Sequence, residues 1–190
     1  MSADRPGFRS AGETMQVNQG APVMVRHEIE IFAPPEKIWE WLSRVDLWED
    51  WRQDVSGSYW LNRRGGTASF KWRLRKLFGI TARVEAWDEE REFGWTGQFW
   101  ISTLKQVMRI DGDFRRTRIV MESSVEGALV RPAPLRAVVR SQLNRTNEIY
   151  LGSLKTKLEA EKPRDETGQR QWSAGSARRP ELPSRNPHLR

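Results

Sequence analysis

Residues Ile29–Trp51 read IEIFAPPEKIWEWLSRVDLWEDW, and this stretch decides how the rest of the chain is interpreted. It begins with strand-like alternation and breaks at Ala33-Pro34-Pro35, because proline donates no hydrogen bond to a sheet and suits the first turn of a helix. The spacing of Ile38, Trp41, Leu42 and Val45 then predicts an amphipathic helix. A second short helical turn, carrying two more tryptophans, is expected over Leu47–Trp51. We expect the tryptophans of this stretch to pack a corner between the two helices.

The segment before the break alternates between apolar and charged residues. Val23–Phe32 places Val25, His27, Ile29 and Ile31 on one face, which predicts a half-buried strand. His27 therefore points to the apolar side, where a lone histidine is more often structural than catalytic. Residues 1–22 are polar and rich in glycine, and are expected to form a disordered lead.

The segment after the corner has the texture of a β-sheet, with turn residues at regular intervals. Six further strands are expected, over Val55–Leu61, Thr67–Arg75, Ile80–Trp87, Glu92–Phe99, Thr103–Asp111 and Arg116–Glu126. Simple alternation places Ala86 on the same side as Val84, and Trp87 on the opposite side. Consecutive hairpins predict an antiparallel meander with one apolar, aromatic face and one charged face.

A long helix is expected at the end of the ordered chain. Leu135–Ala160 carries a broad apolar stripe that includes Leu135, Val138, Val139, Leu143, Thr146, Tyr150, Leu151, Leu154 and Leu158. Its 26 residues would span ~39 Å, enough to cross the sheet and cover its apolar face. Gly152 would either allow a close approach to the sheet or a ligand, or lie exposed. The sequence thus predicts an α+β fold with about seven antiparallel strands, two short helices after the first strand, and one long C-terminal helix.

Length and composition limit the remaining possibilities. The 190 residues suit one domain over 23–161 between the lead and a disordered basic tail over 162–190. The formal net charge is +7, and residues 161–190 hold seven basic against four acidic side chains, so three of the seven excess charges lie there and the body of the chain is only moderately basic. No nucleic-acid-binding signature accompanies this charge, and no nucleic-acid partner is expected. The chain has no cysteine, which excludes disulfides and cysteine-bound metals. No membrane-spanning run or signal-peptide core is apparent, and a cytoplasmic location is expected.

Two motifs carry a resemblance to a known family. They are IFAPPEKIWEWLSRVDLWEDW near the start and RTRIVMESSVEG before the last helix, with the Asp46…Trp48…Trp51 spacing, the Thr117-Arg118 pair and Glu122…Gly127 within them. Together with the order of elements, they resemble the SRPBCC superfamily, also called START-like or helix-grip proteins, in the bacterial polyketide cyclase/dehydrase-like branch. The resemblance implies a curved sheet that grips the last helix around a hydrophobic cavity. Such proteins bind lipids, polyketides or similar ligands, and a minority catalyse cyclisation or aromatisation.

A ligand-binding face is predicted where the apolar side of the sheet meets the last helix. The residues expected to line it are Phe70, Trp72, Leu74, Val84, Phe93, Trp95, Phe99, Met108, Met121, Leu143, Asn147, Tyr150 and Leu154. The alternative is that these side chains only pack the core. We predict that the protein binds a small hydrophobic ligand and acts as its carrier or sensor.

Two other functions stay open at this stage. One is a cyclase/aromatase-like enzyme, for which His27 and Tyr150 are the weak catalytic candidates. The other is an interaction module whose basic tail contacts a membrane or an acidic partner. No metal site and no cofactor are expected, since no suitable cluster of ligands or glycine-rich phosphate loop occurs. The sequence predicts neither the ligand, the oligomeric state nor the pathway.

Overall fold

The computed structural model describes residues 14–63, 68–75 and 78–161. Its elements, in chain order, are β1 (Val23–Ile31), α1 (Pro35–Ser43), the short 3-10 helix η1 (Val45–Leu47), α2 (Trp48–Trp51), β2 (Val55–Asn62), β3 (Ser69–Leu74), β4 (Gly79–Asp88), β5 (Glu92–Phe99), β6 (Ser102–Gly112), β7 (Thr117–Gly127), the 3-10 helix η3 (Ala128–Val130) and α3 (Ala133–Glu161). The expected tail over 162–190 and the first part of the expected lead lie outside the described residues.

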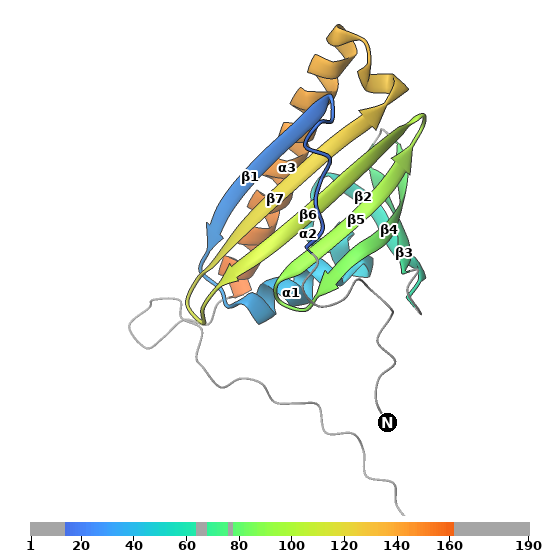
Figure 1. The fold of residues 1–190 in the computed structure, drawn as a ribbon. Helices are drawn as coiled ribbons and strands as arrows, with labels where there is room; N and C mark the ends of the chain where they lie inside the picture. Colours follow the sequence, from blue (N-terminus) through green and yellow to red (C-terminus); the bar gives the residue numbers. More distant parts are fainter. Residues whose placement is uncertain (1–13, 64–67, 76–77, 162–190) are drawn as a thin grey trace, which may run out of the picture.

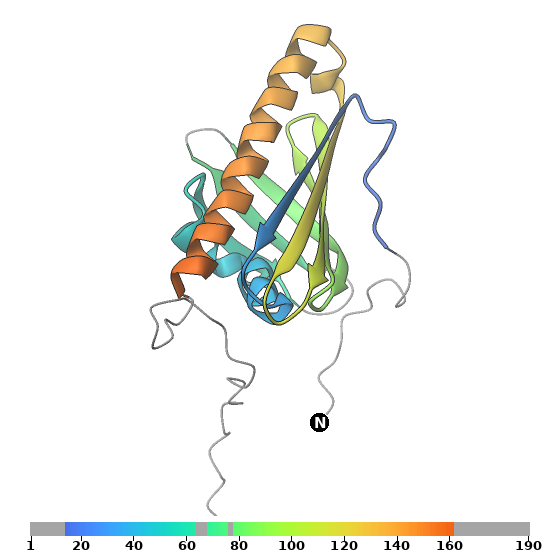
Figure 2. The same ribbon diagram turned by 90° about the vertical axis from the view of Figure 1, so that its left-hand side faces the viewer.

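The seven strands form one antiparallel sheet in the order β1-β7-β6-β5-β4-β3-β2. Strands β2 to β7 follow one another as hairpins, and β1 adds to the free edge of β7, with Val23 opposite Val125 and Ile31 opposite Thr117. The sheet curves around α3, which runs along its concave face (Figures 1 and 2). The helix-grip fold expected from the sequence is therefore confirmed.

The break after β1 has the structure that its prolines predict. Pro35 is the first residue of α1, and the backbone N–H groups of Lys37 and Ile38 both donate to the carbonyl of Pro34, at 3.1 and 3.3 Å. The buried hydroxyl of Thr117 donates to the carbonyl of Ala33 at 2.7 Å. This bond ties the start of β7 to the corner between β1 and α1, which gives the Thr117-Arg118 pair a structural role.

The tryptophans of the corner are not buried equally. Trp41, expected in the buried stripe of α1, is only half-buried; its indole N–H donates to Glu161 at 3.2 Å and Lys157 lies over its ring. Trp48 is fully buried and Trp51 nearly so. Trp48 donates to the carbonyl of Leu42 at 3.1 Å, which fixes the turn between α1 and α2. The deeper part of the corner is thus α2, which directs its tryptophans into the core.

A β-bulge in β4 changes the expected sides of two residues. Val84 lies opposite Trp95, but Ala86 lies opposite Gly94, so the pairing slips by one residue between them. An inserted residue reverses the alternation of side chains beyond it. Ala86 therefore packs on the convex face, and Trp87 packs against the concave core, where its ring contacts Phe93 edge-on at 5.7 Å.

The convex face is partly covered by residues that precede β1. Met15 and Val17 are buried and form a small apolar cluster with Ala86 and Val107. These two residues fall within the range expected to be a disordered lead, so part of that range packs on the sheet. Gly94 makes this possible, because a Cβ on residue 94 would overlap the sulfur of Met15.

Helix α3 is exposed over its first turns and packs against the sheet from Leu143 onward. Residues Leu143, Thr146, Asn147, Tyr150, Leu151, Leu154 and Leu158 are buried against the sheet. Leu135 and Val138, expected in the same apolar stripe, are exposed, because the helix begins beyond the end of the sheet (Figure 2). An added Cβ at Gly152 would have no described atom within 4 Å, so this glycine does not serve a close approach to the sheet.

Candidate functional site

The structure brings all the predicted ligand-binding residues together. Each is buried, and they meet between the concave face of the sheet and the second half of α3; they are Phe70, Trp72, Leu74, Val84, Phe93, Trp95, Phe99, Met108, Met121, Leu143, Asn147, Tyr150 and Leu154. Aromatic rings dominate the centre, where Phe70 and Trp72 both contact the ring of Trp95, with centroids 5.8 and 6.0 Å apart. That these residues contact a ligand stays a prediction.

An ion pair lies inside this aromatic cluster. Arg52, the residue after α2, is only 1% exposed, and its Nε and Nη2 atoms donate to the two carboxylate oxygens of Asp54 at 3.2 and 2.7 Å. The guanidinium carbon lies 5.0 Å from the ring centre of Trp48, 4.8 Å from that of Trp72 and 4.1 Å from that of Tyr150. Three aromatic faces and one carboxylate thus hold the cation in place.

Several buried polar atoms in and around the cluster have no hydrogen-bond partner among the described residues. They include Nη1 of Arg52, the indole Nε1 atoms of Trp51, Trp72 and Trp95, the hydroxyl of Tyr150 and that of Ser58. A buried polar group without a partner costs about 1–3 kcal/mol, so a core that served only to pack would rarely keep so many. The arrangement indicates an interior suited to a molecule that supplies partners.

Tyr150 is one of the two residues considered as catalytic candidates. Burial raises the pKa of its hydroxyl far above the ordinary value near 10; the nearby Arg52 opposes this shift and Asp54 adds to it. The phenol therefore stays protonated throughout the physiological range and can donate a hydrogen bond there. It is too weak an acid to exchange its proton readily near neutral pH.

His27, the other candidate, lies in a different environment. It is partly exposed on β1, and its Nε2 atom is 3.8 Å from Oε1 of Glu148, a residue on the exposed side of α3. Its Nδ1 atom is buried and without a hydrogen-bond partner in the described part of the chain. The contacts of His27 and those of Tyr150 involve different residues, so the structure does not pair the two as an acid and a base.

A second polar group crosses from the sheet to the helix. The amide nitrogen of Gln106 donates to Ser123 at 3.0 Å and to Asn147 at 3.2 Å, and the amide nitrogen of Asn147 donates to Ser123 at 3.1 Å. All three side chains are buried. The triangle fixes the rotation of α3 relative to β6 and β7, which gives Asn147 a positioning role beside its predicted contact with a ligand.

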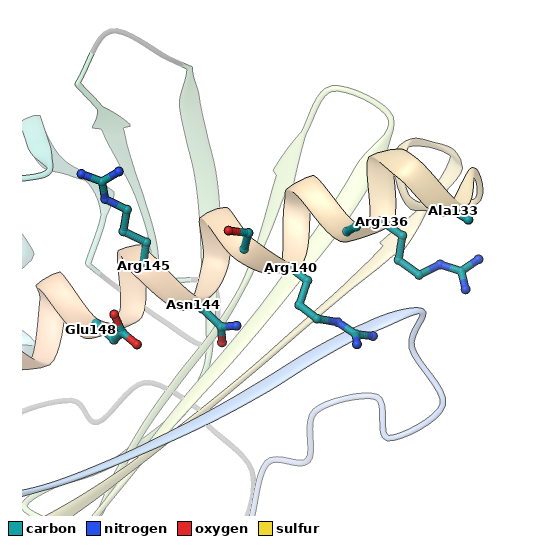
Figure 3. A pocket seen from close by; sticks show the side chains of 8 residues that line it. Ala133, Arg136, Arg140, Asn144, Arg145 and Glu148 are labelled. Atoms are coloured by element: carbon teal, nitrogen blue, oxygen red, sulfur yellow. The ribbon is translucent and has the colours of Figure 1, made fainter.

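A separate hollow of about 810 Å³ lies along the exposed first half of α3, lined by Ala133, Arg136, Ala137, Arg140, Ser141, Asn144, Arg145 and Glu148. Arg140 points to the side on which β1 lies and donates to the carbonyl of Pro22 at 3.2 Å, whereas Arg145 points the opposite way (Figure 3). The hollow is polar and contains none of the predicted site residues. It is therefore distinct from the predicted apolar site.

Sequence reasoning missed Arg52, Asp54 and the inward role of Trp48. Arginine is rarely fully buried, so the apolar periodicity that predicts buried residues does not point to Arg52. The available signal was the run Trp51–Asp54, in which an arginine directly follows tryptophans and a carboxylate stands two residues later. Such a pair can enter a core together, because the carboxylate compensates the charge.

Two further properties concern the described ranges alone. Within residues 14–63, 68–75 and 78–161, no group of three or more His, Asp or Glu side chains is placed to hold a metal ion. In the same ranges, no helix is long and apolar enough to cross a membrane.

The chain was compared with known proteins. Residues 22–159 match the model of the family described as polyketide cyclase / dehydrase and lipid transport. The chain belongs to this family. No curated protein sequence matches it.

Solved structures of this family's fold resemble the chain at low sequence identity. A START superfamily protein from Mycobacterium smegmatis is 19% identical, with a TM-score of 0.63 over 72% of this chain and 97% of the other. The Zhui aromatase/cyclase from Streptomyces sp. R1128 is 17% identical, with a TM-score of 0.65 over 72% and 93%. The di-domain aromatase/cyclase BexL is 14% identical, with a TM-score of 0.62 over 75% of this chain and 52% of the other. At these identities the likeness concerns the fold.

Proposed function

We propose that this protein binds a small hydrophobic ligand, as a carrier or a sensor, between the concave face of the sheet and α3. The observation that carries the proposal is the set of buried polar atoms in an otherwise aromatic interior. The indole N–H groups of Trp72 and Trp95 have no partner in the described chain, and neither does the hydroxyl of Tyr150. Ligand sites have this composition, in which apolar walls hold a few polar groups.

Native mass spectrometry of the protein purified from its own host tests the proposal directly. We expect an additional mass of a few hundred daltons, on the order of a ligand that fits a pocket of this class, and its loss after extraction with organic solvent. A matched pair of variants tests on which face of the sheet the ligand lies. Val84→Phe adds bulk on the concave face and should abolish the additional mass, whereas Val107→Phe adds the same bulk on the convex face and should retain it. Both variants are first shown to be folded by their melting transitions.

Two results would contradict the proposal. One is a protein without an additional mass that also fails to take up any of a panel of apolar probes. The other is equal retention of the mass by the two valine variants, because the ligand would then lie outside the concave face.

A second candidate function is cyclisation or aromatisation of the bound ligand, since two of the similar solved structures are aromatase/cyclase proteins. Here Tyr150 would donate a hydrogen bond to the ligand, and His27 would act from the edge of the site. Conversion of the co-purified ligand by the wild type, and its loss in Tyr150→Phe or His27→Ala, would support this candidate. Unchanged conversion in both variants would remove the roles given to them.

A further inference from the structure

The hydrogen-bonding state of Arg52 specifies what kind of group the ligand must bring. A guanidinium has five N–H donors and no acceptor. Asp54 engages Nε and Nη2 of Arg52, while Nη1 is buried and has no partner among the described residues. Since this atom can only donate, another donor cannot satisfy it, and an acceptor is required.

Side chains next to Arg52 also carry buried hydrogen-bond donors that lack an acceptor among the described residues. The indole of Trp72, whose ring centre lies 4.8 Å from the guanidinium carbon, also only donates, and its Nε1 lacks a partner within the described chain. Ser58 lies opposite Trp72 in the register of β2 and β3, and its side chain is buried as well. Tyr150, with its ring centre 4.1 Å from the guanidinium carbon, has a buried hydroxyl that can donate too. These groups form a region rich in donors on one side of an apolar interior.

The charge of the site decides which acceptor fits. Asp54 is nearly as buried as Arg52, and the pair it forms with Arg52 is already neutral. A buried carboxylate added beside this pair would carry an uncompensated negative charge, which is costly in an interior of low polarity. A carbonyl oxygen accepts the same hydrogen bonds without adding charge.

We propose that Arg52 and Trp72 anchor a carbonyl oxygen of a neutral, apolar ligand, and that the Arg52–Asp54 pair discriminates against acids of the same size. The inference rests on the proposed ligand-binding function and adds the chemical class of the ligand and the residues that select it. Arg52 is then a specificity-determining residue, and Asp54 orients its guanidinium.

Three probes of one shape test the selection. They are 2-acetonaphthone, a neutral ketone; 2-ethylnaphthalene, which has no acceptor; and 2-naphthoate, an acid. Dissociation constants are measured at pH 7 by isothermal titration calorimetry and by quenching of tryptophan fluorescence. The wild type should bind the ketone about tenfold or more tightly than the hydrocarbon, since a charged donor contributes on this order, and more tightly than the acid.

Variants assign the preference to its residues. Removal of Arg52 alone would leave Asp54 buried and unpaired, so the pair is replaced together in Arg52→Met/Asp54→Leu, which keeps the volume and the neutrality. This variant should bind ketone and hydrocarbon within about twofold of each other. Trp72→Phe retains a ring and loses one neutral donor, and should lower the ketone preference several-fold. Trp41→Phe is the matched control, since its indole N–H is bonded to Glu161, and it should keep the wild-type preference.

The outcomes separate this inference from the function on which it rests. If the wild type binds ketone and hydrocarbon equally, a trapped water satisfies the donors, and the inference fails while ligand binding stands. Tighter binding of the acid, or an intact ketone preference in the double variant, also overturns it. Binding of none of the three probes overturns the inference, and it overturns the proposed function as well only if the purified protein also carries no additional mass.

Discussion

The two faces of the sheet use their arginines in different ways. On the convex face, Arg109 directs Nε toward Glu92 at 3.4 Å, and donates from Nη1 to Glu122 at 2.7 Å and from Nη2 to the carbonyl of Met15 at 2.7 Å. On the concave face, Arg52 engages Asp54 with two nitrogens and leaves the third without a partner in the described residues. Each nitrogen of the first arginine thus has a protein oxygen within 3.4 Å, whereas one nitrogen of the second has no partner in the described residues.

The apolar parts of the two faces differ in the same sense. The convex cluster is small, and the segment before β1 closes it: Met15 is held at its N–H by Glu92, at 2.7 Å, and at its carbonyl by Arg109. The concave face is larger and aromatic, and five of its buried polar groups lack partners within the described chain: the indole N–H groups of Trp51, Trp72 and Trp95 and the hydroxyls of Ser58 and Tyr150. Our proposal therefore rests on the buried donors of the concave face that lack acceptors in the described ranges, and not on burial alone.

The largest effect is expected from breaking the concave core at Trp48. This fully buried ring contacts Phe70, Trp72, Phe93 and Tyr150 edge-on. Trp48→Ala should lower the free energy of unfolding by about 3–5 kcal/mol, measured by chemical denaturation, because it removes the ring and leaves a cavity. Trp100→Ala, at an exposed tryptophan in the β5–β6 turn, is the control and should change it by less than about 0.5 kcal/mol. Similar losses in both variants would contradict the packing described here.

A smaller effect is expected on the convex face. Gly94→Ala should lower the free energy of unfolding by about 1–3 kcal/mol, because the added methyl group takes the place of the Met15 side chain. The loss should be specific to this contact, so the same substitution should cost less when Met15→Ala is already present. A double-mutant cycle measures the coupling. If the two changes simply add, Met15 does not occupy this niche.

Periodicity predicted most of the fold because each strand has one buried face. Alternation places Phe93 and Trp95 correctly, and the prolines at 34 and 35 locate the start of α1. It fails at Ala86 and Trp87, where the bulge in β4 reverses the sides, since a bulge leaves no mark in alternating residues. It also fails at Leu135 and Val138, because a helical stripe does not reveal where the sheet beneath it ends.

The site was predictable only in its apolar part. Hydrophobic residues on one face must meet the covering helix, and this rule placed the aromatic residues beside Tyr150. The buried charge of Arg52 could not be found in this way, because its burial depends on Asp54 and on three rings from α2, β3 and α3. Such an environment exists only after the chain has folded.

The buried hydroxyl of Tyr150 should make the stability of the protein depend on pH at alkaline values. The pKa of Tyr150 is raised by burial, so above pH 10 the unfolded chain loses this proton while the folded protein keeps it. The contribution of Tyr150 to stability is therefore complete below about pH 10, the ordinary value for tyrosine, and declines as the pH rises above it. Tyr150→Phe should remove this decline, whereas Tyr59→Phe, at the exposed tyrosine of β2, should retain it. Denaturation midpoints between about pH 8 and 11 measure the difference. Parallel profiles for the wild type and Tyr150→Phe would show that water reaches the hydroxyl. The Tyr150 hydroxyl would then no longer count as a buried donor that a ligand must satisfy.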